Sequence, residues 1–560
     1  MLLLSDFVAM PLSSSASPWF VFKGQDSKRK IWKIGVAILG IKKPTIETKS
    51  KIFAASKLSS HEKVNVWQCN LELSQNDNEH KESIYVNKKE YKLTVPAVHQ
   101  AARTLYTSCN GYQRKQDKDS VGGITPMWSQ VNQEHEKSPI HLMIGCGDQI
   151  YADGLVKLEG SSPSLGDIHG VFALPSMRQW LSLSDEERKH SLFTETMHRE
   201  IERFYFEQYS KHWQEPEFKK SLSMIPMLAT WDDHDIFDGF GSYPSYLQDT
   251  PVFKETFKIA HRYYLIFQHQ ISPDICASKP PEYFTTASES MLQVIDNNRT
   301  ALLIMDTRSE RTQSQICSPE TWNKAFAILN SLPDSVIHLN VILGVPVAYP
   351  NLSLFESLLQ FLHTYRFGRW ILRHISGFMN QFREPELADD GRDHWGSKTH
   401  QEERNLMLKR FQCFAKEKNI RVTFTGGDVH ACGMAKISPV DSKESDENNP
   451  QVIYQWITSP IGNIPAPNLL TWFINKLNAT ARKLNDLVQM HLETLHEKFG
   501  KKSFFGLLNR RNFLVMQLDT ETQVLKGELH VEEEVGKADQ CMRIYAKSIP
   551  PITTKSSILT

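Results

Sequence analysis

The chain has 560 residues, of which 40% are hydrophobic, so it is long enough for more than one domain and for a large buried core. Lys and Arg together number 64, as do Asp and Glu, and this balance argues against a protein whose main task is to bind nucleic acid. The eight cysteines are scattered and include no CxxC pair, so neither a disulfide framework nor a zinc ribbon is indicated.

The N-terminal segment shows no targeting signal. Residues Met1–Asp6 contain neither a basic region nor a full apolar run, and no twin-arginine signal is present there, so no export signal is predicted. The chain also contains no run of roughly 18 apolar residues, so no transmembrane span is expected. We therefore expect a cytoplasmic protein, and export by another route stays open.

Residues 1–98 are predicted to form a small β-rich domain. Short segments alternate polar and apolar residues, as half-buried strands do, and polar stretches such as Ser74–Lys81 separate them. We interpret this region as a small N-terminal β-sandwich. The predicted strands are Trp32–Leu39, Val64–Leu71 and Tyr91–Val95.

Residues 99–548 are predicted to form a second domain of the α/β class. Its first strand is predicted at Leu105–Gly111, with Cys109 near its carboxyl end. Helical patterns then alternate with apolar segments that suit buried strands, and one pair of segments suits a hairpin. The predicted helices include 177–223, Phe253–Gln268 and Glu402–Lys418, and the predicted hairpin spans Ser290–Asp306.

Two segments of this domain are interpreted as helical insertions. Residues 352–382 are aromatic and basic, and we consider a helix packed on the core, a lid over the site and a helix at a membrane surface. Residues 469–499 are predicted to form one long helix or a helical pair. The last residues, 549–560, are predicted to be a disordered tail.

The most informative pattern is an apolar strand followed at once by Asp together with Tyr or His, and it occurs three times. Acids and imidazoles at three strand ends, far apart in sequence, are hard to explain as solvated turns. If these strands share a sheet, the side chains converge, and buried carboxylates need the counter-charge that a metal ion supplies. The three stretches are Gly147–Tyr151 after 140–144, Trp231–Asp235 after 224–229, and Gly427–His430 after 420–424.

The complete set of motifs resembles the PhoD-type alkaline phosphatase family, which belongs to the calcineurin-like metallophosphoesterases. The motifs are, in chain order, Cys109, Gly147–Tyr151, Trp231–His234, Asp306–Arg308 and Gly427–His430. The resemblance covers roughly residues 100–530. It implies a four-layer α/β/β/α core with metals at the carboxyl ends of the central strands, preceded by a small N-terminal β domain.

The resemblance also implies a binuclear or larger metal centre, in which Fe³⁺ and Ca²⁺ are the expected ions. In this family Asp148 would take the place of the acid that bridges two ions. His234 would take the place of the histidine that contacts the phosphate or the leaving group. The implied metal ligands are Cys109, Asp148, Tyr151, Asp233, Asp428 and His430.

These residue types suit the hydrolysis of phosphate esters. Thiolate and phenolate ligands stabilise a ferric ion, and carboxylates suit calcium. Two metals lower the pKa of a bridging water and clamp the phosphoryl oxygens, so we predict attack on a phosphomonoester or phosphodiester by a metal-bridging hydroxide. His234 is the predicted catalytic group, and Arg308 and Arg311 are predicted to bind the substrate's non-bridging oxygens.

Two alternatives to this function stay open. One is a catalytically silent protein that keeps the fold as a binding scaffold, and the other is a phospholipase-like diesterase that contacts a membrane through 352–382. Individual residues also have structural alternatives: Cys109 and Tyr151 as core residues, Asp153, Asp232 and Asp235 as capping residues, and Asp306 with Arg308 as an ion pair. A phosphate ester is the expected partner, no nucleic-acid domain is evident, and the oligomeric state stays open.

Overall fold

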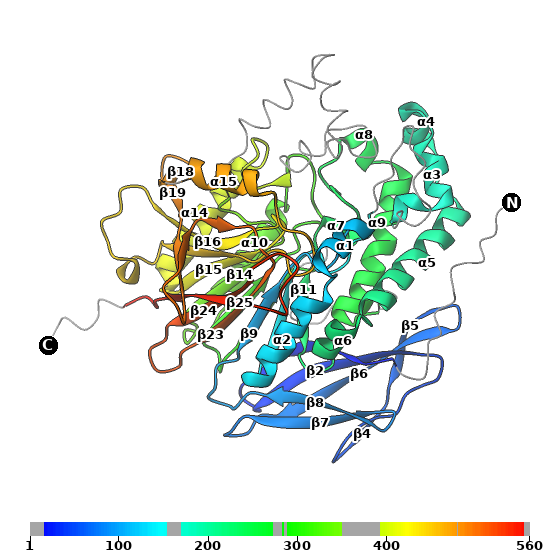
Figure 1. Cartoon of the computed structure of the whole chain (residues 1–560), viewed down its shortest axis with the longest axis horizontal. Helices are drawn as coiled ribbons and strands as arrows, with labels where there is room; N and C mark the ends of the chain where they lie inside the picture. Colours follow the sequence, from blue (N-terminus) through cyan, green and yellow to red (C-terminus); the bar gives the residue numbers. More distant parts are fainter. Residues whose placement is uncertain are drawn as a thin grey trace.

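The computed structural model describes residues 16–153, 170–272, 283–284, 288–349, 393–478 and 480–553. The predicted insertion at 352–382 therefore lies outside the described residues, as does most of the predicted disordered tail. Two large β-sheets face each other at the centre of the molecule, and helices cover their outer faces (Figure 1). No described helix combines the length and apolarity that a membrane crossing needs.

The larger sheet has twelve strands in the described part of the chain, and its centre is parallel. Strand β10 pairs in parallel with β9 on one side and with β11 on the other, and β1 continues the parallel pairing from β11. Every residue of β9, β10 and β11 is buried, as expected for parallel strands covered on both faces. The order is β21 (Ser503–Phe505), β20 (Thr494–Glu497), β25 (Met542–Ile549), β24 (Leu525–Glu532), β23 (Asn512–Leu518), β9 (Thr104–Thr107), β10 (Leu142–Cys146), β11 (Met227–Thr230), β1 (Trp19–Asp26), β2 (Ile31–Gly40), β6 (Val64–Ser74) and β5 (Ser56–His61).

The second sheet is also parallel at its centre, where β13, β14, β15 and β17 pair in sequence. Strands β12 and β13 form the hairpin predicted from the sequence. The order is β12 (Met291–Ile295), β13 (Thr300–Ile304), β14 (His338–Ile342), β15 (Arg421–Gly426), β17 (Ile453–Ile457), β16 (Cys432–Pro439), β19 (Val488–Leu492) and β18 (Arg482–Lys483), and β22 (Leu507–Leu508) pairs with β16.

The N-terminal residues form the predicted β-sandwich, but one of its sheets is the edge of the larger central sheet. Strands β1, β2, β6 and β5 belong to that central sheet, and a separate four-stranded sheet packs on them. The small sheet has the order β4 (Ile52–Phe53), β3 (Ile46–Thr48), β7 (His80–Val86) and β8 (Lys89–Val95). Whether residues 1–98 form an independent domain therefore stays a prediction.

Helices pack on the outer face of each central sheet. The helices on the larger sheet share a hydrophobic core with β1, β10 and β11, and α10 and α14 share another with β13, β14 and β15. The α-helices are α1 (Lys115–Val121), α2 (Thr125–Lys137), α3 (Pro175–Leu181), α4 (Asp185–His190), α5 (Glu195–His212), α6 (Pro216–Leu222), α7 (Asp233–Ile236), α8 (Ser245–Gln248), α9 (Pro251–Tyr264), α10 (Pro319–Asn330), α14 (Gln401–Lys418) and α15 (Asn468–Leu477). The π-helix η2 (Leu265–His269) follows α9, and short 3₁₀ helices lie at η1 (Val171–Ala173) and η3 (Asp446–Asn448).

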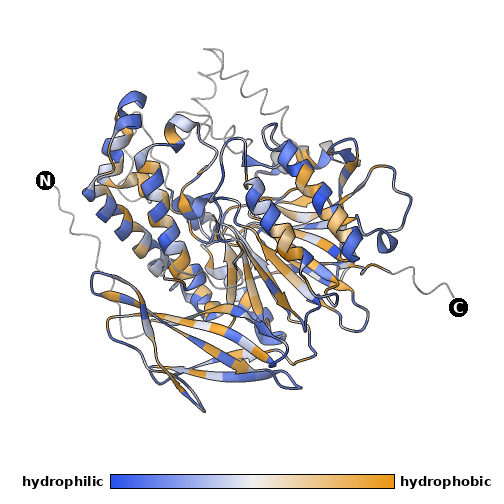
Figure 2. Cartoon of the chain, turned by 180° about the vertical axis from the view of Figure 1, so that it is seen from behind, coloured by the Kyte–Doolittle hydropathy of each residue, from blue (hydrophilic) through white to orange (hydrophobic). Residues whose placement is uncertain are grey.

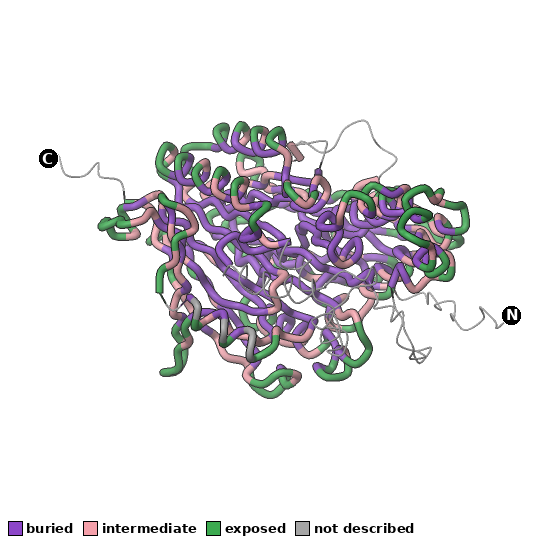
Figure 3. The backbone as a smooth tube through the Cα atoms, turned by 90° about the horizontal axis from the view of Figure 1, so that it is seen from above, coloured by how far each residue is buried: buried purple, intermediate pink, exposed green. Residues whose placement is uncertain are grey.

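The layers follow the order helix, sheet, sheet, helix, as predicted. Apolar residues gather on the strands, while the exposed faces of the helices are hydrophilic (Figure 2). Seen from above, buried residues fill the centre of the molecule and exposed residues lie around its rim (Figure 3). A third hydrophobic core, between the two sheets, includes Tyr106 and Ile144 from one sheet and Ile304 and Trp456 from the other.

The predicted helical insertion at 469–499 is wrong in most of its length. Helix α15 ends at Leu477, and the following residues form β18, β19 and β20. In β19 every second residue is buried, which is the period of a strand and not of a helix. The first residues of the predicted tail are also ordered, because the Thr553 N–H donates to the Glu447 carbonyl at 3.0 Å.

Candidate metal centre

The candidate site lies where the carboxyl ends of five parallel strands meet. The predicted site residues follow these strands, most of them in loops and Asp233 and His234 in the first turn of α7, so two sheets contribute side chains to one place. Ligands commonly bind at this edge of parallel sheets, because the loops there converge. The contributing loops follow β9 (Cys109), β10 (Asp148 and Tyr151), β11 (Asp233 and His234), β13 (Arg308 and Arg311) and β15 (Asp428 and His430).

Four of these residues have backbones in the left-handed region. The φ angles are +51° at Cys109, +53° at Asp148, +62° at Asp428 and +49° at His430. Residues other than glycine adopt this conformation uncommonly, and the surrounding structure must hold it in place. Cys109 and Asp148 follow strands of one sheet and Asp428 and His430 follow a strand of the other, so the four turns lie at the same edge of the two sheets.

Cys109, Asp148, Tyr151 and His430 form one half of the site. The Cys109 thiol lies 3.5 Å from Asp148 Oδ2 and 3.0 Å from Ser459 Oγ. The Tyr151 hydroxyl lies 3.3 Å from His430 Nε2, so these two side chains meet across the two sheets. Burial raises the pKa values of the Cys109 thiol and the Tyr151 phenol well above their ordinary values. Both groups therefore stay protonated unless a cation compensates the charge.

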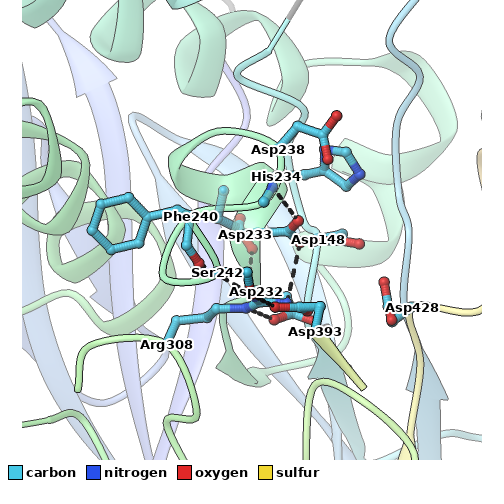
Figure 4. Close-up of polar contacts among 12 residues, drawn as sticks. Asp148, Asp232, Asp233, His234, Asp238, Phe240, Ser242, Arg308, Asp393 and Asp428 are labelled. Atoms are coloured by element: carbon cyan, nitrogen blue, oxygen red, sulfur yellow. Dashed lines mark hydrogen bonds and ion pairs between the residues drawn. The ribbon is translucent and has the colours of Figure 1, made fainter. Parts of the chain in front are cut away.

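The second half of the site is a cluster of buried carboxylates. Ligand atoms of Asp148, Asp233 and His234 all lie within 4.8 Å of one another, and so do those of Asp232, Asp233 and Asp428. Figure 4 shows these acids pointing into a shared space from different loops. Buried oxygens of Asp148, Asp232 and Asp233 have no hydrogen-bond donor in the described structure.

The electrostatics of this cluster fit a bound cation. Burial raises the pKa values of Asp148 and Asp428 well above the ordinary carboxyl value, and the nearby carboxylates of Asp232 and Asp233 raise them further. Unpaired buried carboxylates are costly, and a multivalent cation among them removes that cost. The donor set, with carboxylates, one imidazole, one phenol and one thiol, therefore fits metal binding.

His234 is held in place by two neighbours. Its Nδ1 lies 2.7 Å from Asp153 Oδ1, and its ring stacks on Tyr151 with the centroids 4.3 Å apart. Burial alone would lower the pKa of His234, but the carboxylates of Asp153, Asp233 and Asp148 outweigh it and raise the pKa well above its ordinary value. These carboxylates therefore favour the charged form of the imidazole.

Arg308 and Arg311 lie beside the cluster but are fully buried and engaged with protein oxygens. Arg308 Nη1 donates to the Phe240 carbonyl at 3.1 Å and to Asp393 Oδ1 at 2.7 Å, and its other nitrogens contact Asp232, Asp233 and Asp393. The Nη2 of Arg311 donates to the Asp393 carbonyl at 2.7 Å. This geometry does not support the predicted substrate contacts of the two arginines. It gives them instead a role in compensating the negative charge of the acids.

Three residues near the site were not among the predicted site residues. Asp393 pairs with the two arginines and accepts a hydrogen bond from the Ser242 hydroxyl. Burial would raise the pKa of Asp393, but Arg308 and Arg311 hold it well below its ordinary value. His394 Nδ1 lies 4.0 Å from Asp428 Oδ2. Asp153 is the carboxylate that contacts His234 Nδ1. Asp393 and His394 follow no strand in the described structure, so the strand-end pattern gave no signal for them.

Other motif residues have structural roles. Asp235 accepts hydrogen bonds from the backbone N–H groups of Asp232, Gln149 and Ile150 at 3.0–3.3 Å, so it ties two site loops together. Trp231 is fully buried, and its indole N–H donates to Asp306 Oδ1 at 2.8 Å. These contacts agree with the capping alternative considered for Asp235 and give Trp231 a structural role in the core.

Comparison with known proteins gives three findings. A family model described as PhoD related phosphatase matches residues 85–368 and 371–491. The uncharacterized protein YGR266W of Saccharomyces cerevisiae is 29% identical over 443 residues, which cover 69% of this chain and 60% of that protein. This chain thus spans about 60% of the length of that curated relative. A solved structure of PhoD aligns with a TM-score of 0.55 over 96% of this chain and 92% of that chain, and at 13% identity this likeness shows a shared fold.

Proposed function

Because the chain belongs to the PhoD related phosphatase family, we propose that it hydrolyses phosphate esters at the metal centre described above. The observation that supports this proposal most is the convergence of Asp148, Asp232 and Asp233, each of which has one buried oxygen without a hydrogen-bond donor in the described part of the chain. Such a cluster is unstable without cations, and cations held at the edge of two sheets are typical of phosphoryl-transfer sites.

The ligand types divide between two kinds of ion. Cys109, Tyr151 and His430 would hold a ferric ion, and Asp233 and Asp428 would hold calcium or a similar cation, with Asp148 between them. The assignment of Fe³⁺ and Ca²⁺ follows the family resemblance. When bound, the ions supply a water of lowered pKa and positive charge for the phosphoryl oxygens.

His234 would act on the leaving group. Asp153 fixes its ring through Nδ1, so Nε2 is left to donate a proton to the departing oxygen. Burial alone would lower the pKa of His234, and the Asp153 carboxylate, which is not one of the proposed metal ligands, raises it and so favours the protonated ring. Arg308 would act indirectly, because its contacts with Asp232 and Asp393 hold the acids in their arrangement.

Substitution of Asp148 tests the proposal. The Asp148→Asn variant keeps the size of the side chain but loses the negative charge that would lie between the ions. We expect the turnover of p-nitrophenyl phosphate and of bis(p-nitrophenyl) phosphate to fall by about a thousandfold or more, with a loss of bound metal. Metal content is measured by mass spectrometry on the same samples, and the ratio of the two rates separates monoesterase from diesterase activity.

The exposed Asp539 provides the matched control, since Asp539→Asn makes the same chemical change away from the site. This control should keep both the metal content and the turnover of the unmodified chain. Near-normal turnover in Asp148→Asn would show that the proposed site is wrong. A metal-loaded chain that hydrolyses neither ester would favour the scaffold alternative.

A further inference from the structure

A basic pocket lies directly beside the candidate metal centre. Its volume is about 270 Å³, and its walls come from the loop after β9, from α1 and from the end of α5. A cavity of this size accepts a small ligand or one group of a larger ligand, because drug-sized ligands occupy roughly 300–1,000 Å³. Four basic side chains line it, namely Arg114, Lys115, Lys118 and Lys211.

The positive charge of the pocket is only partly compensated. Asp119 and Glu215 are the acidic residues among its walls, and Arg114 is paired with Asp117 at 3.0 Å. Lys115, Lys118 and Lys211 form no ion pair within 4.0 Å in the described part of the chain. A concave site with surplus positive charge attracts anions, and several ammonium groups together favour a multiply charged phosphoryl group over a single carboxylate.

Two contacts connect the pocket to the catalytic residues. Tyr151 forms part of the pocket wall and stacks on His234. Gln113, another wall residue, donates to Asp153 Oδ2 at 2.9 Å, and the other oxygen of Asp153 binds His234 at 2.7 Å. Only the side chain of Tyr151 would therefore separate a ligand group in the pocket from His234, the residue proposed to act on the ester.

We propose that this pocket binds a second phosphoryl group of the substrate, so that the preferred substrates carry two phosphoryl groups, one at the metal centre and one among Lys115, Lys118 and Lys211. The inference rests on the proposed function, because it assigns the ester to the neighbouring centre. It adds a substrate class to that function: phosphate esters with a second, non-reacting phosphate.

The experiment compares two sets of substrates. Linear alkanediol bisphosphates of increasing chain length are tested beside the matching alkyl monophosphates, with the double variant Lys118→Gln/Lys211→Gln and the unmodified chain. We expect the double variant to lose about tenfold in kcat/KM for the best bisphosphate and to stay within about twofold for the monophosphates. The exposed Lys189 lies on α4 and does not line the pocket, so Lys189→Gln is the matched control and should behave as the unmodified chain.

Other outcomes would overturn the inference. An equal loss on both kinds of substrate would mean that the lysines support the centre and do not bind a second phosphate. Calorimetric titration with inorganic phosphate distinguishes a free anion from a substrate group. Phosphate binding that the double variant loses, without any change in the preference between substrates, would indicate a regulatory anion and not a substrate subsite.

A calorimetric titration also separates a failure of this inference from a failure of the proposed function. If the unmodified chain hydrolyses no ester, the proposed function fails. The anion site is then tested alone by titrating an alkanediol bisphosphate into the unmodified chain and the double variant. Binding that the double variant loses supports the pocket as a phosphoryl site, and equal binding by both proteins overturns it.

Discussion

At the scale of single residues, His234 depends on its neighbours for both orientation and charge. Asp153 accepts from Nδ1, Tyr151 supports the ring face, and the surrounding carboxylates favour the charged form. A histidine fixed in this way needs no reorganisation before it donates a proton, which is how a positioned acid contributes to rate. Asp153 therefore acts through His234 and is a positioning residue.

Replacement of Asp153 tests this role. In Asp153→Asn the side chain keeps its shape but loses its charge, so we expect kcat to fall by about tenfold to a hundredfold while KM changes by less than about twofold. Steady-state kinetics measure kcat and KM separately and so test this expectation. Asp153→Glu, which restores the carboxylate, should recover part of kcat. An increase in KM with an unchanged kcat would mean that Asp153 serves substrate binding and not the orientation of His234.

At the scale of elements, the centre depends on segments that approach one another very closely, both between the two sheets and within the larger sheet. Gly427 follows β15, and a Cβ atom at this position would lie 2.2 Å from Ser108 Oγ, in the loop after β9. Gly147 has a φ of +96°, and its added Cβ would lie 2.8 Å from Asp232 Cβ. Both glycines are therefore needed for the contact between loops, and not only for the turn that each makes.

The Gly427→Ala substitution should push these two loops apart. The Ser108 hydroxyl donates to the Thr458 carbonyl at 2.7 Å, and the added Cβ would also lie 3.0 Å from the Cys146 carbonyl oxygen. Because neither neighbour can move aside freely, we expect a loss of about 1–3 kcal/mol in the free energy of unfolding, together with reduced metal content. Urea denaturation and metal analysis measure the two effects. At Gly40, far from the site, an added Cβ meets its nearest neighbour at 3.3 Å, so Gly40→Ala is the matched control and should retain its metal. A Gly427→Ala chain with full metal content would contradict the proposed role of close loop packing.

The sequence predicts those parts of the site whose signal is local. An apolar strand followed by Asp and Tyr or His is visible in a single short segment, and the structure brings together the side chains that this pattern selected. Asp393 could not be found in this way, because it follows no strand in the described part of the chain and its partners Arg308 and Arg311 lie more than eighty residues away. The helical prediction for 469–499 is wrong because a short amphipathic helix and an alternating strand follow each other closely there, so no single period describes the whole segment.

At the scale of the whole molecule, the N-terminal residues are part of the central sheet. Strand β1 lies between β11 and β2, so it covers the edge of the strand that leads to Trp231 and His234. Trp19 of β1 is buried, and its indole N–H donates to the Phe267 carbonyl at 2.9 Å. The Trp19 ring also stacks on the Phe267 ring, with the two centroids 5.4 Å apart. Residues 1–98 thus contribute both hydrogen bonds and apolar contacts to the layer that carries the site.

This arrangement predicts that a chain starting at residue 99 does not fold by itself. The truncation would expose the edge of β11 and the apolar residues that pack on Trp19, and an exposed edge of this kind promotes aggregation. We expect residues 99–560 to be insoluble or to lack a cooperative thermal transition, and co-expression with residues 1–98 to restore both folding and activity. The full chain, expressed and purified in the same way, is the control and should show a cooperative thermal transition. A soluble and active 99–560 fragment would show instead that the predicted boundary at residue 98 separates two independent domains, and that the shared sheet contributes little to the stability of the metal centre.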